Sequence, residues 1–533
     1  MLAIEHEFRF SQKILIVMSA RVEQFYSFYY ALPLSESEYE ITVLLQSELS
    51  YRISDERFSL LQTAISPICG ETLEESIKIQ LAEGYDSVVI LYNNRDGHGY
   101  EAIDRLAMGI KAKNRYVFDI DGSFFAFNED YLGYKAVEMP KKRRKDLDKA
   151  LKIADSIQVM PIEGDDNVKP TIIFLTTQGF NLPAARVRCF FLSEELNKLG
   201  WQTEVLSTVT HLGYGEEWEL SLSDKMAINR HLGELLTSKG KVVIYMQRLD
   251  YQAWIVKKLY EEDDIPFIFD YDDWDLQYFP LKELFSDEFS NGEQLLRYFI
   301  ANSRLNVLSS RYLEQYFSKI SPNVLYLPTG VYRANFISQK SGSREVQPGK
   351  RVVISWLGTV MRLSNMRDLI FTIQAFNKLS PNYPEAVLEI LASGRYLKRV
   401  KGFSQGNERI IFKGWCKPDE VVDYLRTVDI GLLPLVDRSP FNQSKSPTKL
   451  FEYMYLGRAV LASEVGEACA VVKDSINGML FRDEEEFAVK LGQLIEQPQL
   501  RASMGRAAQA TIEAEYTLDQ LASNLAKKLD EVL

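Results

Sequence analysis

The chain has 533 residues, of which 46% are hydrophobic and 26% charged, and its formal net charge is −12. This length is too great for a single hydrophobic core, so two to four domains are expected. The negative charge argues against general nucleic-acid binding, which needs cationic side chains, and no apolar run approaches the roughly 20 residues that cross a bilayer.

The cysteines and the N-terminal residues predict the compartment. The first ten residues have neither the basic start nor the apolar core of a signal peptide. The four cysteines have no paired spacing, so neither a disulfide framework nor a zinc site is indicated. We therefore expect a cytoplasmic, reduced protein.

The first block of the sequence predicts a Rossmann-like accessory domain over residues 1–162. Short apolar runs alternate with helical patterns, as in α/β layers around parallel sheets. Strands are predicted at 13–19, 39–46, 86–93 and 115–121, and a helix at 101–112. The block contains no G-x-G-x-x-G pattern, so a dinucleotide is not indicated. The polar residues 163–170 are a predicted linker.

A basic run, KKRRK at 141–145, stands out in this block. Its simpler interpretation, which we favour, is the solvated start of a helix. The alternative is a cationic spot that holds the protein at an anionic membrane surface.

Two further blocks repeat the alternating pattern, and their domains are predicted at 171–340 and 350–515. Strands of the first are expected at 171–180, 202–207, 241–247, 266–273, 305–310 and 323–328, with a helix at 186–200. Strands of the second are expected at 351–359, 386–394, 409–415, 428–435, 458–463 and 477–481. Two helices are then expected to reach the C-terminus, the last over 516–533. Consecutive doubly wound domains imply a ligand cleft between the carboxyl ends of their strands.

The stretch SPTKLFEYMYLGRAVLAS, 446–463, carries the strongest chemical signal. Pro447 suits a helix start and Gly457 a helix end, so the helix N-terminus is expected to face the cleft, where it favours an anion. Lys449 adds a charge suited to phosphate, and Glu452 on the same face can accept two hydroxyl hydrogen bonds from a ribose. The alternative is an exposed ion pair between Lys449 and Glu452, worth about 0.2–0.5 kcal/mol.

These residues resemble the GT-B glycosyltransferases grouped with sucrose and glycogen synthases, the glycosyl transferases group 1 family. The resemblance covers 171 to about 520. It rests on SPTKLFEYMYLGRAVLAS followed by NGMLF, and on the ordered segments ISWLGT (354–359), IFKGWCKPDEVVDYLRTVDIGLLPL (411–435) and LPTGV (327–331). It implies two Rossmann-like domains facing across a cleft, here preceded by the third, N-terminal domain.

The resemblance also implies site residues. Glu452 matches the second glutamate of a paired motif and should bind ribose, Lys449 should bind the diphosphate, and Arg362 should add charge to this catalytic group. The remaining donor-side positions are Gly358, Thr359, Gly414, Trp415, Ser446, Pro447, Thr448 and Leu450. The backbone of Gly358 and Thr359 is expected at the diphosphate, and Gly414 and Trp415 at the base.

Two departures from the family pattern concern the transferred sugar. The first glutamate of the pair would fall at Ser444, so the identity of the donor is open. Many relatives have a histidine after the fourth strand of the N-terminal half, where this chain has Gln247 and Arg248, which are acceptor-side candidates. His211 lies on a predicted loop and is not expected to act as a base.

Acidic and basic side chains form the acceptor-side candidates. Asp270, Asp272 and Asp273 follow a strand, and we expect them to be exposed in the cleft, because a buried carboxylate triplet would be costly. A helix cap, a solvated turn or a metal site are the alternatives. Arg186 and Arg188 are phosphate-clamp candidates, although at least one of them is expected to face solvent.

The sequence therefore predicts a metal-independent glycosyltransferase without a bound cofactor. It would move a sugar from a nucleotide sugar to a hydroxyl of a glycan, lipid-linked or protein acceptor, with retention implied by the resemblance. A non-catalytic GT-B scaffold is the main alternative, because of Ser444 and the missing histidine. A sugar-nucleotide epimerase is less favoured, since no paired acid and base residues are evident.

Overall fold

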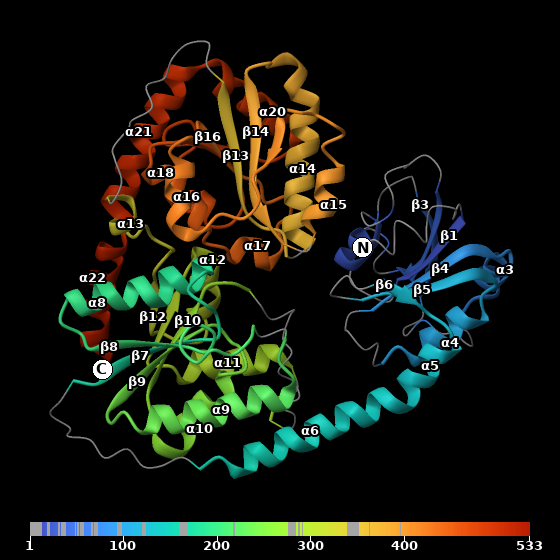
Figure 1. Ribbon diagram of the computed structural model, residues 1–533, viewed down its shortest axis with the longest axis horizontal. Coiled ribbons are helices and arrows are strands. Elements are labelled where there is room, and N and C mark those ends of the chain that lie inside the picture. Colours follow the sequence, from blue (N-terminus) through green and yellow to red (C-terminus); the bar gives the residue numbers. More distant parts are fainter. Residues whose placement is uncertain are drawn as a thin grey trace. The chain divides into compact units, whose positions relative to one another are not determined.

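The computed structural model contains three six-stranded sheets within the residues it describes (Figure 1). These residues are 13–18, 22–29, 32, 39–47, 50, 53, 58–64, 68, 73–92, 99–119, 124–158, 169–216, 219–274, 284–285, 288–289, 291–337, 351–361, 363–394 and 396–533. The α/β class predicted from alternating strand and helix patterns is confirmed. The chain divides into two compact units, Met1–Lys145 and Asp146–Leu533, and each is described by itself.

The first unit is built on one sheet with the strand order β3-β2-β1-β4-β5-β6. Its strands are β1 (Lys13–Met18), β2 (Glu40–Gln46), β3 (Phe58–Thr63), β4 (Tyr85–Leu91), β5 (Ala112–Phe118) and β6 (Phe124–Ala126). Its helices are α2 (Val22–Tyr29), α3 (Glu75–Ala82), α4 (Glu101–Gly109) and α5 (Glu129–Gly133). All pairings are parallel except that of β6. This is a Rossmann-like arrangement, with strand order reversing between β1 and β4.

The second unit begins with a parallel sheet of order β12-β11-β10-β9-β7-β8. Its strands are β7 (Thr171–Thr176), β8 (Thr203–Ser207), β9 (Val242–Gln247), β10 (Phe267–Tyr271), β11 (Leu305–Leu308) and β12 (Val324–Tyr326). Its helices are α7 (Pro183–Ala185), α8 (Leu192–Lys198), α9 (Leu222–Thr237), α10 (Ala253–Asp263), α11 (Gly292–Asn302), α12 (Arg311–Phe317) and α13 (Ala334–Ile337), with a π-helical turn, η4, at Arg186–Phe191. We call this part the N-half. Strand order reverses between β7 and β9, so a ligand is expected at their carboxyl ends.

The rest of the second unit, the C-half, carries a parallel sheet of order β15-β14-β13-β16-β17-β18. Its strands are β13 (Val352–Thr359), β14 (Ala386–Ser393), β15 (Ile410–Phe412), β16 (Ile430–Leu433), β17 (Ala459–Ser463) and β18 (Met479–Phe481). Its helices are α14 (Leu363–Leu379), α15 (Leu397–Gly402), α16 (Pro418–Leu425), α17 (Pro440–Ser444), α18 (Thr448–Tyr455), α19 (Ala468–Val471), α20 (Glu484–Glu496) and α21 (Pro498–Glu515). The switch point is between β13 and β16.

A long helix, α6 (Met139–Ser156), runs through the division between the two compact units. Its basic residues 141–145 are exposed. Further along, Asp146 accepts hydrogen bonds from the backbone N–H groups of Leu222 and Ser223 at the start of α9, and Ala150 is buried in the N-half core. The division between compact units therefore lies inside a helix, ahead of the predicted linker, of which residues 163–168 lie outside the described residues.

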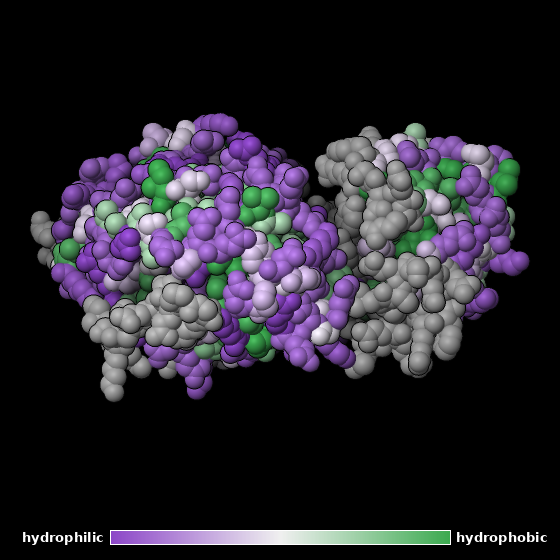
Figure 2. Space-filling model, turned by 90° about the horizontal axis from the view of Figure 1, so that it is seen from above, coloured by the Kyte–Doolittle hydropathy of each residue, from purple (hydrophilic) through white to green (hydrophobic). Residues whose placement is uncertain are grey.

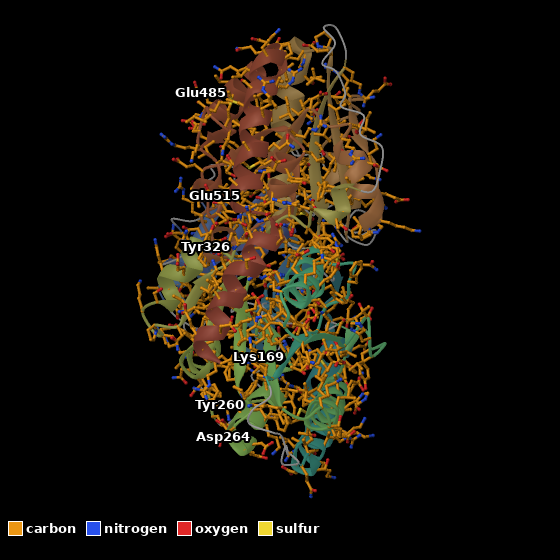
Figure 3. All side chains as sticks on the ribbon, turned by 90° about the vertical axis from the view of Figure 1, so that its left-hand side faces the viewer. Lys169, Tyr260, Asp264, Tyr326, Glu485 and Glu515 are labelled. Carbon is orange, nitrogen blue, oxygen red and sulfur yellow. The ribbon has the colours of Figure 1, made fainter. Side chains whose placement is uncertain are left out.

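The last helix, α22 (Leu518–Val532), returns to the N-half. Three helices, α20 to α22, follow the last strand rather than the two predicted. Leu521 and Leu525 are buried in one cluster with Ile172 and Phe174 of β7, and Lys169 pairs with Asp530 at 2.8 Å. Figure 3 shows α22 alongside the N-half, near the labelled Lys169. The C-terminal helix therefore completes the core of the N-half, not of the half that precedes it in sequence.

On the face seen in Figure 2, the described residues are mainly hydrophilic, with apolar side chains scattered among them. Among all the described residues, no helix combines the length and the apolar character that crossing a membrane requires.

Candidate active site

A cavity of about 320 Å³ lies between the N-half and the C-half. Its walls come from the carboxyl ends of β9, β10, β13 and β16 and from the start of α18, where the switch-point rule places ligands. The structure brings most predicted site residues to its lining: Arg186, Arg248, Asp272, Asp273, Gly358, Thr359, Gly414, Trp415, Ser446, Pro447, Thr448, Lys449 and Glu452. Four predicted residues are absent from this lining: Arg188, Gln247, Asp270 and Leu450. Arg362 lies outside the described residues.

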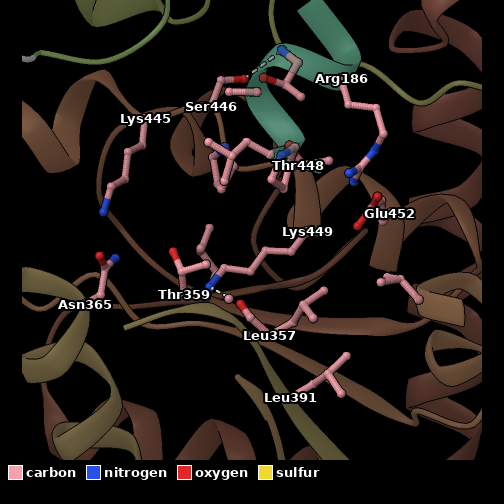
Figure 4. Close-up of a pocket in the computed structure, with 18 of the residues that line it drawn as sticks. Arg186, Leu357, Thr359, Asn365, Leu391, Lys445, Ser446, Thr448, Lys449 and Glu452 are labelled. Carbon is pink, nitrogen blue, oxygen red and sulfur yellow. Dashed lines mark hydrogen bonds between the residues drawn. The ribbon is translucent and has the colours of Figure 1, made fainter. Parts of the chain in front are cut away.

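The N-terminus of α18 opens into the cavity. Pro447 is the N-cap, and none of its side-chain atoms caps the helix. The Leu450 N–H donates to the Pro447 carbonyl, so an anion would be bound by the N–H groups that precede it. The ammonium of Lys449 donates to the Leu357 carbonyl at 2.8 Å and lies 4.4 Å from the centre of the Trp356 ring (Figure 4). The surface ion pair considered as an alternative is thus not formed, and Lys449 is held against β13.

Burial and neighbouring charges act on Lys449. Desolvation, and then the nearby Lys445, lower the pKa of Lys449 to about 7, against an opposing effect of Asp368. A bound diphosphate would stabilise the charged form of Lys449 and raise its pKa toward the ordinary value. The interaction of Lys449 with an incoming anion is therefore strong. The site is therefore suited to phosphate oxygens.

Glu452 lies one turn further along α18, and its carboxylate also faces the cavity (Figure 4). Burial raises the pKa of Glu452 to about 7, and the Arg186 guanidinium opposes this rise. Glu452 and Lys449 extend from one helix face toward the same space, as their spacing predicts. A group with a diphosphate and a diol could therefore span both.

Backbone from β13 and from the residues after β15 forms the facing wall. Gly358 has a positive φ of 154°, and a Cβ there would lie 3.2 Å from the Trp356 ring and 3.6 Å from the Lys449 ammonium. The positive φ and the nearby Trp356 ring thus favour glycine here, whereas the Lys449 ammonium would be at ordinary contact distance from a Cβ. Trp415 is 53% exposed at the cavity, so its ring face is available for stacking on a flat ligand.

The expected exposure is wrong for Asp270 and Asp272, which are buried, whereas Asp273 is partly exposed at the cavity. Arg248, whose φ is +64°, pairs with Asp272 at 2.6 Å and Asp273 at 2.9 Å. The expectation of exposure rested on the cost of burying these carboxylates. Pairing with Arg248 offsets that cost for Asp272 and Asp273.

A second buried ion pair lies beneath the cavity. Arg188 is 1% exposed and Asp270 0%, and Arg188 Nη2 lies 2.7 Å from Asp270 Oδ1. Arg188 also donates to the Leu327 carbonyl, and the Tyr245 hydroxyl donates to Asp270. The expectation that Arg186 or Arg188 faces solvent is also wrong, since Arg186 is 8% exposed.

Gln247 is likewise an interior residue. Its side-chain oxygen accepts from the Thr176 hydroxyl at 2.8 Å. His211, which was not expected to act as a base, accepts from the Ser207 N–H through Nδ1 at 3.1 Å. Both side chains hold the carboxyl ends of N-half strands in place.

Several cavity residues were not predicted from the sequence. Asn365 and Asp368 come from α14, and Lys445 from the residue before Ser446. Burial raises the pKa of Asp368 to about 6, against the effect of Lys445. One of these three residues could have been found from the sequence. Lys445 directly precedes residues 446–463, so a second lysine near the start of this helix could have been added to the candidates.

The C-half matches a known family. Residues 351–497 match the family described as Glycosyl transferases group 1. They form a glycosyl transferases group 1 domain. The resemblance drawn from the sequence is confirmed for this region, and the group 1 domain supplies α18, Lys449 and Glu452.

One curated relative matches a short part of the chain. The putative teichuronic acid biosynthesis glycosyltransferase TuaH of Bacillus subtilis is 38% identical over 56 residues. The matched segment is 10% of this chain and spans only 14% of that protein.

Solved structures support the fold of both halves. Sucrose-phosphate synthase from Thermosynechococcus elongatus has a TM-score of 0.53 at 14% identity, covering 68% of this chain and 99% of that chain. The catalytic domain of starch synthase IV from Arabidopsis thaliana, bound to ADP and acarbose, has a TM-score of 0.52 at 12% identity, with 68% and 99% covered. The predicted GT-B fold, with its group 1 domain as the C-half, is confirmed.

Ser444 of the group 1 domain does not reach the cavity. It is 0% exposed, and its hydroxyl accepts from the Trp274 N–H of the N-half at 2.8 Å and donates to the Phe441 carbonyl. The position of the family's first glutamate therefore joins the two halves.

Replacing Ser444 by glutamate is expected to lower the free energy of unfolding by at least about 2 kcal/mol, because a larger, charged side chain would enter a closely packed site. Urea unfolding measures this. The neighbouring Gln443→Glu, at a partly exposed position, is the control and should change stability by about 0.5 kcal/mol or less. A Ser444→Glu protein with parental stability would show that the position is not closed.

Proposed function

We propose that the chain transfers a sugar from a nucleoside-diphosphate sugar to an acceptor hydroxyl. The observation that carries this proposal is the convergence of the α18 N-terminus, Lys449 and Glu452 on one cavity between the two halves. A departing nucleoside diphosphate gains negative charge, and preorganised donors aimed at it are a large catalytic effect. Glu452 would accept hydrogen bonds from the ribose, and the exposed Trp415 face would stack on the base.

The comparisons support a nucleotide-sugar substrate. The starch synthase IV catalytic domain holds ADP, and the TuaH relative is assigned to teichuronic acid biosynthesis. We propose a role in glycan or glycoconjugate biosynthesis, with a glycan, lipid-linked or protein acceptor. We also propose that transfer retains the anomeric configuration and that the protein is cytoplasmic. Contact of the exposed basic residues 141–145 with an anionic membrane is the less favoured alternative to a solvated helix start.

Transfer is proposed to need no metal ion or bound cofactor. The Lys449 ammonium and the α18 N-terminus would supply the positive charge at the diphosphate. Treating the protein with EDTA and dialysing it should therefore leave its transfer rate within about twofold of the untreated rate, as measured by product formation. A loss that added Mg²⁺ or Mn²⁺ restores would contradict this.

A thermal-shift screen tests the proposed function. A ligand bound only by the folded state raises the unfolding temperature, so ADP, GDP, UDP, CDP and dTDP and their sugars should include at least one stabilising nucleotide. No stabilisation by any of them would contradict the proposal.

The second candidate is a non-catalytic GT-B scaffold. The buried Ser444, which places no carboxylate at the expected sugar position, favours it. Hydrolysis of the stabilising nucleotide sugar distinguishes the two, because a scaffold would bind the nucleotide without releasing sugar at any donor concentration.

A further inference from the structure

Arg186 and Glu452 face one another from opposite halves of the second unit. Arg186 begins the π-helical turn η4 of the N-half, and Glu452 lies on α18 of the C-half. Both line the cavity, and Figure 4 shows the Arg186 guanidinium directed toward the Glu452 carboxylate. Arg186 is thus placed on the nucleoside side of the cavity rather than at a separate acceptor-phosphate site.

The guanidinium is held in this position by its own half. Arg186 Nη1 donates to the Phe180 carbonyl at 3.3 Å and to the Asn181 carbonyl at 3.2 Å. These acceptors are neutral, so they orient the guanidinium without cancelling its charge. The π-helical turn widens the start of this helix locally, a distortion often found at functional sites.

The charges around Glu452 make Arg186 its counter-ion. Lys449, one turn earlier on α18, is engaged with the Leu357 carbonyl, and Arg248 of the N-half is paired with Asp272 and Asp273. Burial raises the pKa of Glu452, and the charge of Arg186 opposes this rise. Conversely, Glu452 opposes the lowering of the Arg186 pKa by burial.

We infer that Arg186 is a positioning residue for nucleoside recognition, which favours the ionised form of the Glu452 carboxylate, the form that accepts hydrogen bonds from both ribose hydroxyls. This inference rests on the proposed function, because it assumes that Glu452 binds ribose. The carboxylate comes from the C-half and its counter-ion from the N-half. Ribose binding consequently depends on the two halves being together, whereas binding of the diphosphate at Lys449 does not.

The test compares Arg186→Gln with the parent over pH 5.5–9.5. The probes are inorganic diphosphate and whichever of ADP, GDP, UDP, CDP and dTDP stabilises the parent most. The Lys449 pKa is also about 7, so nucleotide affinity is divided by the affinity for inorganic diphosphate at each pH. In the parent this ratio should fall as the pH falls through about 7, because Glu452 is then protonated. In Arg186→Gln this fall should begin at higher pH, because the Glu452 pKa is higher. If the pKa rises by one unit, nucleotide binding weakens about fivefold at pH 7 and much less at pH 9.

Two controls separate this role from a general structural one. Arg186→Lys keeps the positive charge and should return the pH profile toward that of the parent, and Arg304→Gln, at an exposed position in the same half, should leave it unchanged. Diphosphate affinity should be equal in Arg186→Gln and the parent, which also shows that the variant is folded.

The outcomes distinguish the inference from the proposed function. If the parent binds a nucleotide but Arg186→Gln shows an unshifted pH profile, or weakens diphosphate equally, the inference is overturned and the proposed function stands. If no nucleoside diphosphate binds the parent, both fail.

Discussion

Replacing Lys449 by glutamine is expected to lower the rate of sugar transfer by about 10²–10³-fold, the usual effect of removing one preorganised donor from a developing negative charge. The glutamine side chain is unbranched near the backbone like that of lysine, but it carries no charge to neutralise the diphosphate. Its partner in the folded protein is the Leu357 carbonyl, at a wall of the cavity rather than in the core. The fold should therefore survive the change. Product formation and nucleotide affinity, measured together, check this expectation.

The control for Lys449 is Lys473→Gln, because the Lys473 side chain is exposed in the same half. It should transfer sugar at the parental rate. Glu452→Gln should weaken nucleoside diphosphate binding while leaving the affinity for inorganic diphosphate unchanged. If Lys449→Gln binds nucleotide and transfers sugar as well as the parent, the assigned role of the α18 N-terminus is wrong.

Replacing Arg188 by methionine is expected to lower the free energy of unfolding by about 3–5 kcal/mol. The change leaves Asp270 buried without its counter-ion, and burial already raises the pKa of Asp270 to about 6 with Arg188 present. Without the arginine the folded pKa rises further above the unfolded value. The destabilisation should then shrink as the pH falls, because a protonated Asp270 carries no charge to compensate. Urea unfolding at pH 8 and pH 5 measures both effects.

Arg297→Met is the matched control, since Arg297 pairs with Glu293 at 3.0 Å on the surface. An exposed pair of this kind contributes about 0–1 kcal/mol. The double variant Arg188→Met with Asp270→Asn should recover part of the lost stability, because it removes both charges. Parental stability of Arg188→Met would mean that Arg188 is not needed to compensate Asp270, and would reopen its predicted role as a phosphate clamp.

The strands and the group 1 features were predictable because they are local patterns. Buried parallel strands such as β7, β9 and β13 read as continuous apolar runs, and each was predicted at its place. β3 and β6 were missed, since β3 mixes polar and apolar residues and β6 is a short antiparallel strand at the sheet edge. Lys449 and Glu452 were found because a single helical turn fixes their relation.

The contacts between the halves could not be predicted, because they join residues far apart in the sequence. No feature of the sequence around Asp270 shows that Arg188 is its partner. Exposure of Asp270 was expected because of the cost of burying a carboxylate, and Arg188 offsets that cost. Ser444 was interpreted as a departure from the family pattern, but its bond to the Trp274 N–H depends on how the two halves meet. For the same reason the sequence does not show that Arg186 of the N-half and Glu452 of the C-half line one cavity.

The return of α22 to the N-half means that the chain crosses between the halves twice. The second crossing is pinned where the Val331 N–H donates to the Tyr516 carbonyl and the Leu518 N–H donates to the Val331 carbonyl, both at 2.9 Å. A truncation that removed α22 would therefore loosen the N-half, the part of the unit encoded furthest from the C-terminus.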